Sequence, residues 1–330
     1  MSQQPPVVSI RGLTRGESGA LERVARELRS ACVEWGVFQI ADHGIPQPVL
    51  ERFEAAMRGL FALPPEEKQR VRRTRNNARG YYDEELTKNR PDWKEVFDYG
   101  APPSADPAAA AHSDGTNQWP ASAPELRQPL LDFYEASVRV ASGLLRAICL
   151  SLELPAGTLD PLFEGHSSFV RLNHYPVCPD PAPHDADRFP ERGKLGVHHH
   201  TDAGALTVLF QDDVAGLQVW RDGHFVLLEP VPGALAVNLG DLIQVCSNDR
   251  YVAPLHRVTA NAARERFSAP FFLNPAYDAR YAPVPSLMRR DESPRYREIS
   301  WGHFRDRRSA GDYANYGAEI QISDYRVDAD

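Results

Sequence analysis

The sequence predicts a mostly β core of the sandwich or jelly-roll kind, with flanking helices, behind an N-terminal helical region. In the first half of the chain, apolar residues recur at helical spacing. From about residue 167 they alternate in short runs that are separated by turn residues. Several short strands at such spacing are typical of a sandwich or jelly roll. The predicted strands are 168–175, 204–211, 216–220, 224–228, 234–238, 241–246, 255–259 and 267–273.

The N-terminal region begins with an amphipathic helix, which the hydroxyl of Ser18 is expected to cap. A short apolar run at 36–40 predicts a strand that ends at the turn 43–46. A second amphipathic helix covers 49–60, and the prolines that follow it are expected to begin a third, basic helix. The apolar stripe of the first helix consists of Leu21, Val24, Ala25, Leu28 and Cys32.

A change of composition divides the chain. Residues 101–124 are rich in Pro, Ala, Ser and Asp, which indicates a surface loop, and a long helical pattern from Leu130 to Ile148 follows. We therefore expect an N-terminal helical or mixed region over 1–125. The catalytic β core, with its long supporting helix and C-terminal tail, is expected over 126–330. The segment 177–193 is expected to be a loop over the rim of the core.

Composition excludes several classes of protein. Hydrophobic residues make up 42% and charged residues 25% of the 330 residues, as in ordinary globular proteins, and the net charge is −8. An acidic chain has no basic field for phosphate backbones, so nucleic acid is not an expected partner. No signal peptide or membrane span is evident, and four widely spaced cysteines form no CxxC pair. We expect a cytoplasmic protein with reduced thiols, no membrane partner and an undetermined oligomeric state.

The most informative segment for chemistry is the run from His198 to Asp202. On a strand, residues i and i+2 point to the same side, so His200 and Asp202 can reach one metal, as could His198 and His200. His256 is the candidate third ligand from a distant strand. Two imidazoles and one carboxylate form the facial triad of non-haem Fe(II) oxygenases, which leaves coordination positions open. Zinc is the second candidate metal, and surface histidines are the alternative for an isolated HxD pattern.

Arg266 and Ser268 form a candidate anion site. They lie on a predicted strand ten residues after His256, and the i, i+2 spacing puts both on one face. A buried guanidinium is costly unless it meets an anion, and a guanidinium with a hydroxyl suits a carboxylate. A structural ion pair is the alternative for Arg266 alone.

Taken in order, the motifs resemble the isopenicillin N synthase-like group of 2-oxoglutarate/Fe(II) dioxygenases, which includes plant flavonoid and gibberellin oxidases. The resemblance covers nearly the whole chain, and the number of matches in order makes it specific. The matching segments are 34–40, 42–45, Arg79-Gly80-Tyr81, 93–97, Asn173-His174-Tyr175-Pro176, His200-Thr201-Asp202, Gly204, Leu206-Thr207, 216–219, 237–241, Ser247-Asn248, His256-Arg257-Val258 and Arg266-Phe267-Ser268.

The resemblance implies a double-stranded β-helix, the jelly roll of cupin-like proteins. It implies that Arg266 and Ser268, with Tyr175, bind the distal carboxylate of 2-oxoglutarate, and that Asn173 lies beside this co-substrate. It also implies Fe(II), dioxygen and ascorbate as a reductant. The implied reaction is hydroxylation, desaturation or cyclisation of a small-molecule metabolite, as in secondary metabolism, with release of succinate and CO2.

Two other functions stay open at this point. An Fe(II) oxidase of the same fold that does not use 2-oxoglutarate, like isopenicillin N synthase or aminocyclopropane-carboxylate oxidase, also carries HxD, a distal His and RxS. The position of Asn173 two residues before Tyr175 resembles the 2-oxoglutarate users more. A cupin-like sensor with a vestigial metal site is disfavoured by the intact set of five residues, and Asp202 disfavours halogenation.

The substrate is less constrained than the co-substrate. The resemblance implies that Tyr81, Arg171, Phe272 and Asn274 line the substrate pocket. Because Arg171 lies next to the strand that carries Asn173 and Tyr175, we hypothesise that it pairs with an acidic or carbonyl group of the substrate. His198 and His199 are expected to be solvated residues of the rim. The stretch from Gly311 to Tyr325 resembles the terminal helix and tail that close over the pocket, with a subunit contact as its alternative.

Overall fold

The computed structural model describes residues 4–102, 115–186, 188–314 and 320–327. Two sheets form its core. The larger one has eight strands in the order β1-β2-β12-β9-β14-β7-β6-β3, and the smaller has four in the order β11-β10-β13-β8. The strands of the larger sheet are β1 (Val7–Ser9), β2 (Val37–Ala41), β12 (Leu235–Leu239), β9 (Leu206–Gln211), β14 (Arg266–Leu273), β7 (Phe169–Tyr175), β6 (Glu95–Gly100) and β3 (Gly80–Tyr82). Those of the smaller are β11 (His224–Leu227), β10 (Leu217–Arg221), β13 (His256–Thr259) and β8 (Leu195–His200).

The path of the chain between the sheets is that of a jelly roll. From β7 to β10, successive strands alternate between the larger and the smaller sheet, and β12, β13 and β14 do the same. Side chains from both sheets line one internal cavity, so the sheets face each other across it. The predicted double-stranded β-helix is therefore confirmed.

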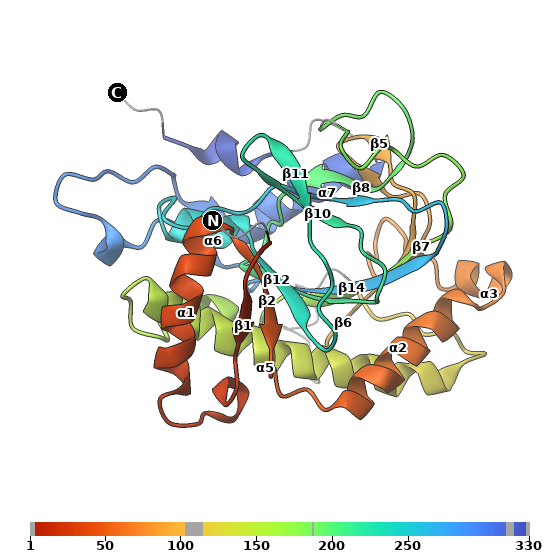
Figure 1. Cartoon of the computed structure of the whole chain (residues 1–330), viewed down its shortest axis with the longest axis horizontal. Coiled ribbons are helices and arrows are strands. Elements are labelled where there is room, and N and C mark those ends of the chain that lie inside the picture. Colours follow the sequence, from red (N-terminus) through yellow and green to blue (C-terminus); the bar gives the residue numbers. More distant parts are fainter. Residues whose placement is uncertain (1–3, 103–114, 187, 315–319, 328–330) are drawn as a thin grey trace.

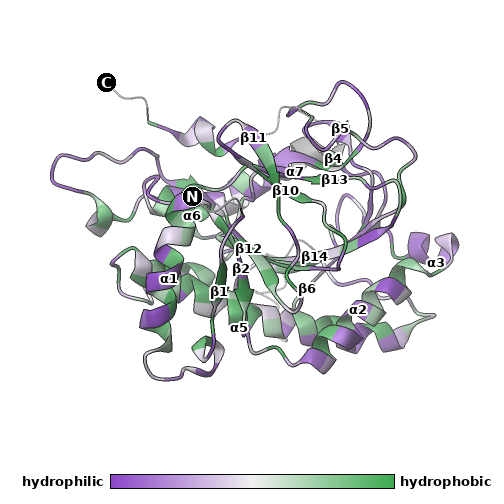
Figure 2. Ribbon diagram, viewed as in Figure 1, coloured by the Kyte–Doolittle hydropathy of each residue, from purple (hydrophilic) through white to green (hydrophobic). Residues whose placement is uncertain are grey.

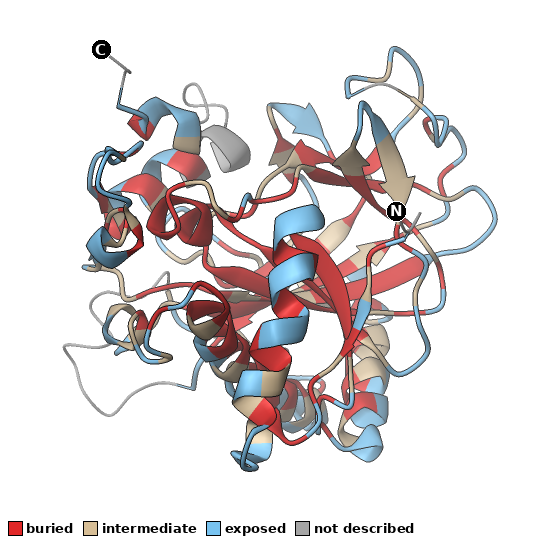
Figure 3. Ribbon diagram, turned by 60° about the vertical axis from the view of Figure 1, so that its left-hand side comes forward, coloured by how far each residue is buried: buried red, intermediate tan, exposed pale blue. Residues whose placement is uncertain are grey.

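Three helices cover the outer face of the larger sheet (Figure 1). They are α1 (Ala20–Glu34), α2 (Gln47–Phe61) and α5 (Arg127–Ser151), and α5 packs against both other helices and against β9 and β14. Phe53 of α2 stacks on Phe133 of α5 with ring centroids 3.8 Å apart. The green inward sides in Figure 2 and the exposed outer sides in Figure 3 show the amphipathic pattern that fixes these helices on the sheet.

The remaining elements are short, apart from the C-terminal helix α7 (Trp301–Ala314). Trp301 and Phe304 are fully buried and anchor α7 beside the barrel. Among the described helices, none is both long and apolar enough to cross a bilayer. The short elements are α3 (Pro65–Arg70), α6 (Asp241–Cys246), β4 (Leu86–Thr87), β5 (Arg90–Pro91), β15 (Arg280–Tyr281), β16 (Ile299–Ser300) and the 3-10 turns Leu13–Arg15, Pro124–Leu126, Asp160–Phe163, Pro285–Leu287 and Ile322–Tyr325.

Two local predictions were wrong. Residues 241–246 form helix α6 and not a strand: all six are buried, and a short buried run has no periodicity that separates helix from strand. The N-cap of α1 is Gly19, without a side-chain hydrogen bond, and not Ser18. Of the predicted loop at 101–124, residues 103–114 lie outside the described part of the chain, as do 315–319 of the predicted C-terminal closure.

Candidate metal centre

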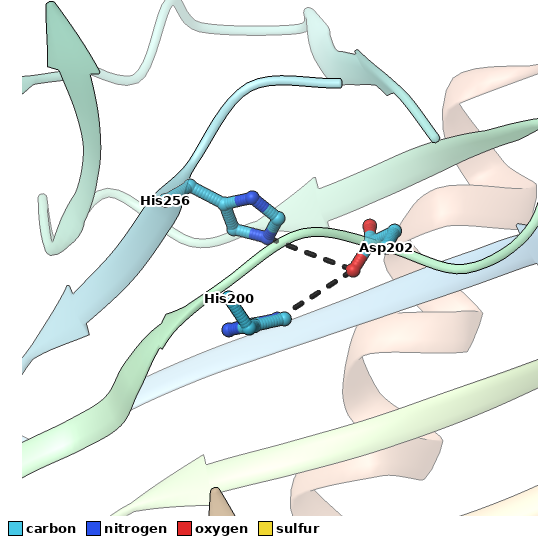
Figure 4. A group of neighbouring side chains, drawn as sticks. All are labelled: His200, Asp202 and His256. Atoms are coloured by element: carbon cyan, nitrogen blue, oxygen red, sulfur yellow. Dashed lines mark ion pairs between the residues drawn. The ribbon is translucent and has the colours of Figure 1, made fainter. Parts of the chain in front are cut away.

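His200, Asp202 and His256 converge at one end of the barrel (Figure 4). The ligand atoms of all three residues lie within 4.8 Å of one another. Asp202 Oδ1 is 3.5 Å from His200 Nε2 and 3.7 Å from His256 Nε2. The two histidines are direct neighbours across β8 and β13, whereas Asp202 lies in the loop after β8. The ladder thus fixes the histidine pair, and the loop adds the carboxylate.

Hydrogen bonds fix the orientation of each ligand. His200 Nδ1 lies 2.8 Å from the carbonyl of His198, and His256 Nδ1 lies 3.0 Å from the carbonyl of Pro254. These contacts place a proton on Nδ1 of each ring, so Nε2, on the side of Asp202, is the ring nitrogen that can bind a metal. Asp202 Oδ2 accepts hydrogen bonds from Asn238 Nδ2, at 2.8 Å, and from the hydroxyl of Thr207.

Close backbone contacts also hold the loop that carries Asp202. The N–H of Asp241 donates to the carbonyl of Asp202 at 2.7 Å, and the N–H of Gly240 donates to that of Ala205 at 2.9 Å. A Cβ atom at Gly240 would lie 2.2 Å from the carbonyl oxygen of Gly204. Only glycine permits this approach, which explains the Gly240-Asp241 pair of the motif.

The electrostatics of the site favour the neutral imidazole of His256 and the ionised carboxylate of Asp202. Burial and the nearby His200 lower the pKa of His256 to about 4. Burial opposes ionisation of Asp202, but the two histidines outweigh it and hold its pKa far below the ordinary value. Burial also opposes protonation of His200, whose pKa Asp202 nevertheless raises. A neutral imidazole and an ionised carboxylate suit Fe(II), so the residues fit a facial triad.

The cavity beside the triad contains the predicted anion site. Arg266, Ser268, Tyr175 and Asn173 line it together with the three candidate ligands. They come from paired positions of β14 and β7, where Arg266 faces Tyr175 and Ser268 faces Asn173. The Arg266 guanidinium carbon lies 5.1 Å from the centroid of the Tyr175 ring.

Arg266 is held so that one nitrogen remains available. It is 2% exposed, and its Nε donates to the carbonyl of Val214 at 3.0 Å. Its Nη2 donates to Gln211 Oε1 at 3.1 Å, whereas Nη1 has no hydrogen-bond partner among the described residues. The buried Oδ1 of Asn173 likewise has no partner there. Buried polar atoms of this kind are rare, and a carboxylate-bearing ligand in the cavity would accept a hydrogen bond from Arg266 Nη1, whereas Asn173 Oδ1 requires a donor.

A second part of the cavity, which we call the outer part, shares His200 and Asp202 with the first and is also lined by residues of helix α7. Phe272, Asn274 and Arg171 line it, as predicted for the substrate. Arg171 is also held in ion pairs: its Nε and Nη2 each lie 2.8 Å from an oxygen of Asp98, and its Nη1 lies 2.8 Å from Glu85 Oε1.

Tyr81 does not join the described lining of either part of the cavity. Its hydroxyl donates to Glu95 Oε2 at 2.6 Å, and it pairs with Phe97 across β3 and β6. Glu95 and Phe97 alternate with Lys94, which lines the cavity, so Tyr81 lies on the opposite face of the sheet. The sequence motif that contains Tyr81 was identified correctly, but the prediction that Tyr81 points into the cavity was wrong.

His198 and His199 are not solvated rim residues, contrary to the prediction. They are 7% and 4% exposed. Asp92 Oδ1 accepts from the backbone N–H of His198 at 3.1 Å and lies 3.0 Å from its Nδ1. His199 Nδ1 lies 2.9 Å from the carbonyl of Arg188, a residue of the 177–193 segment, which covers this strand and removes it from solvent.

Several residues of the site escaped the sequence argument. Thr207 and Asn238, which bind Asp202, were within quoted motifs but carried no chemical signal of their own. Lys94 is a buried lysine at the boundary of the two parts of the cavity, and it follows Trp93 in another quoted motif. Glu85 and the α7 residues Trp301, Arg305 and Arg308 line the outer part. For the α7 residues, one indication came from the sequence, which was the expectation that the C-terminal segment closes over the pocket.

Comparison with known proteins gives the family. The profile described as 2OG-Fe(II) oxygenase superfamily matches residues 166–275, and the profile described as non-haem dioxygenase in morphine synthesis N-terminal matches 5–122. The chain is 34% identical over 312 residues to the 2-oxoglutarate-Fe(II) type oxidoreductase hxnY of Emericella nidulans, covering 90% of this chain and 86% of hxnY. It is 34% identical to gibberellin 20 oxidase 2 of Oryza sativa, covering 85% and 70% of the two chains.

Solved structures agree with this assignment. JOX2 in complex with 2OG, Fe and JA superposes with a TM-score of 0.76 at 27% identity, over 92% of this chain and 84% of JOX2. A 2OG-Fe(II) oxygenase family protein of Caulobacter crescentus gives a TM-score of 0.79 at 26% identity, over 93% and 99% of the two chains. These relatives favour 2-oxoglutarate over the oxidase alternative. The chain therefore belongs to the 2OG-Fe(II) oxygenase superfamily and is a non-haem Fe(II) enzyme that uses 2-oxoglutarate and dioxygen to oxidise a small molecule.

Proposed function

We propose that His200 Nε2, His256 Nε2 and the Asp202 carboxylate hold the Fe(II) ion. We also propose that Arg266 and Ser268, with Tyr175 and Asn173, hold 2-oxoglutarate. The observation that carries the second assignment is the buried Nη1 of Arg266, which has no hydrogen-bond partner among the described residues and belongs to a side chain that lines a cavity shared with the triad. A distal carboxylate at this nitrogen would place the 2-oxo acid end of the same molecule toward the metal ligands.

When bound, Fe(II) and 2-oxoglutarate would activate dioxygen, which is the oxidant: the oxidative decarboxylation of 2-oxoglutarate to succinate and CO2 would supply part of the electrons that dioxygen takes up, and a C–H bond of the substrate would supply the rest. The chain's own part is positioning. The Val214 carbonyl and Gln211 fix the plane of the Arg266 guanidinium. Asn238 and Thr207 fix Asp202 Oδ2 and thereby leave Oδ1 for the ion. The apolar side chains of Leu209, Leu217 and Val258 line the same cavity and exclude water from it.

The substrate is proposed to occupy the outer part of the cavity. Phe272 and Phe169, with ring centroids 4.8 Å apart, offer it an aromatic wall, and Asn274 offers an amide. Arg171 is retained as a substrate contact, with its ion pairs to Asp98 and Glu85 fixing the guanidinium at the cavity wall. An Arg171→Ala variant with wild-type turnover of the true substrate would remove Arg171 from this proposal. Hydroxylation, desaturation and cyclisation of this substrate are all compatible with the arrangement.

The central test begins without oxygen. Fe(II) and 2-oxoglutarate added to the anaerobic protein are expected to give a weak visible charge-transfer band, which His256→Ala and Arg266→Ala should each weaken. Oxygen-dependent succinate release is then measured against a library of small metabolites, and product analysis identifies the reaction. A wild-type protein that forms no band and releases no succinate would contradict the proposed site.

The cytoplasm is the compartment that we propose for this enzyme. All four cysteines, Cys32, Cys149, Cys178 and Cys246, are buried free thiols, which supports a reducing environment. Localisation of the tagged full-length protein by fractionation tests this, and recovery outside the cytoplasm would contradict it.

A further inference from the structure

Arg308 reaches from helix α7, outside the barrel, to the loop that carries the metal ligands. Its Nη1 donates to Asp241 Oδ2 at 2.8 Å, and its Nη2 donates to the carbonyl oxygen of Thr201. Thr201 is the residue between His200 and Asp202, so the guanidinium is hydrogen-bonded to the backbone between two candidate ligands. The side chains of Arg308 and Asp241 are 6% and 0% exposed, which makes this a buried ion pair with a backbone contact.

The same pair ties the loop to the start of α6. The backbone N–H of Asp241 donates to the carbonyl of Asp202, and the N–H of Leu242 donates to that of Gly204 at 3.1 Å. Asp241 therefore makes two contacts: its main-chain N–H holds the loop, and its carboxylate binds Arg308. A planar guanidinium can hold a carboxylate and a carbonyl at a fixed angle, which an ammonium cannot do.

We infer that Arg308 is a positioning residue for the metal centre, and this inference rests on the proposed function. Cross-strand pairing of β8 with β13 fixes His200 against His256. Asp202 lies past the end of β8, so its place depends on the contacts of the loop. By fixing the Thr201 peptide, Arg308 sets the spacing of His200 and Asp202, and metal affinity thus depends on a helix outside the jelly roll.

A direct metal titration tests this role independently of turnover. The metal-free full-length protein is titrated with Mn(II) under anaerobic conditions at saturating 2-oxoglutarate, and free Mn(II) is read by EPR. Loss of an outer contact to a metal ligand typically weakens affinity by about 10- to 100-fold, and we expect this for Arg308→Met. Arg308→Lys keeps the positive charge but loses the planar pair of donor nitrogens, so its Mn(II) affinity should lie between those of Arg308→Met and wild type. Arg307→Met changes the exposed neighbour and should bind within about twofold of wild type.

A double variant separates positioning from folding. Arg308→Met alone leaves the buried Asp241 carboxylate without its cation, which destabilises the fold. In Arg308→Met/Asp241→Asn both charges are gone, so the Tm of the metal-free protein should return toward wild type while Mn(II) affinity stays about 10-fold weaker or more. Mn(II) affinity within twofold of wild type in the double variant or in Arg308→Lys would overturn the inference. A wild type that binds Mn(II) no better than His256→Ala would instead overturn the proposed ligands, and this inference with them.

Discussion

The two parts of the cavity are built in different ways. The part that we assign to 2-oxoglutarate is lined by strand residues of both sheets, and buried polar atoms of Arg266 and Asn173 there have no hydrogen-bond partner in the part of the chain that the structure describes. The outer part adds Glu85 from the segment between β3 and β4 and three residues of α7. There, Arg171 and Arg308 are held by the carboxylates of Asp98 and Asp241.

This difference indicates how one fold can bind a constant ligand, 2-oxoglutarate, and a substrate that varies. Strand positions are fixed by the ladder, so a site on them is rigid and can hold an unpaired donor, here Arg266 Nη1, ready for a single dicarboxylate. Loops and a terminal helix can change without disturbing the barrel, which suits the part that meets the substrate. Variants of each part should therefore affect different ligands.

The largest effect is expected from His256→Ala, because the ion serves both parts of the cavity. Loss of one of the three ligands should lower turnover by a factor of about 1000 or more, as metal-dependent steps depend on several kcal/mol of stabilisation. Succinate release and Fe(II) binding should fall together. Retention of tight Fe(II) binding in this variant would show that a different set of residues holds the ion.

Arg266→Ala should affect the strand-built part alone. Removing one partner of a buried charged contact typically costs 2–5 kcal/mol, so the KM for 2-oxoglutarate should rise by about 100-fold. Arg264→Ala is the matched control, since Arg264 lies two residues earlier with a 60% exposed side chain and pairs with the exposed Asp213. If Arg266→Ala raised the KM for the substrate as strongly as the KM for 2-oxoglutarate, the two parts of the cavity would not bind separate ligands.

The strand-built part was also the part that the sequence predicted. The i, i+2 spacing placed Arg266 and Ser268 on one face, because alternation along a strand fixes which side chains share a face, whereas Asn173 and Tyr175 came from the family resemblance. Asp202 joins the two histidines for another reason: it lies in a loop after β8, where alternation no longer applies. Its place depends on hydrogen bonds from Thr207 and from the distant Asn238, 36 positions away.

The residues that the outer part adds to these strand positions were harder to predict, because they come from segments with no shared period. Tyr81 carried the motif but lies on the opposite face of the sheet, and the α7 arginines gave no sign of facing the cavity. His198 and His199 look polar in sequence, yet Asp92 and the backbone of Arg188 compensate their burial. Such pairings depend on long-range contacts that no local pattern encodes.

Arg171→Met sharpens the comparison from the side of the substrate. It removes a cavity-lining cation and leaves Asp98 and Glu85 with fewer partners, so we expect about a 10-fold loss in kcat/KM for the substrate and a lower free energy of unfolding. The KM for 2-oxoglutarate should change less than twofold. A shift of both KM values by the same factor would show that the two parts of the cavity are not independent.

The smallest effect is expected from Glu95→Gln, which alters β6 on the face turned away from the cavity. Burial raises the pKa of Glu95, but hydrogen bonds from His174, Lys68 and Tyr81 outweigh this and lower it to about 2. Because the folded pKa is depressed, the carboxylate stabilises the fold fully above its unfolded pKa, and this contribution is lost as the pH falls toward 2.

At neutral pH, Glu95→Gln should therefore lower the free energy of unfolding by about 2 kcal/mol, and the difference from wild type should shrink below pH 4. Denaturant unfolding at a series of pH values measures it, with kcat and both KM values unchanged at pH 7. Glu265→Gln is the control, since its 54% exposed carboxylate contacts the other nitrogen of His174 and should matter less. If the difference in the free energy of unfolding between Glu95→Gln and wild type stayed constant from pH 7 to pH 3, packing, and not the charge of Glu95, would stabilise the face of β6 that is turned away from the cavity.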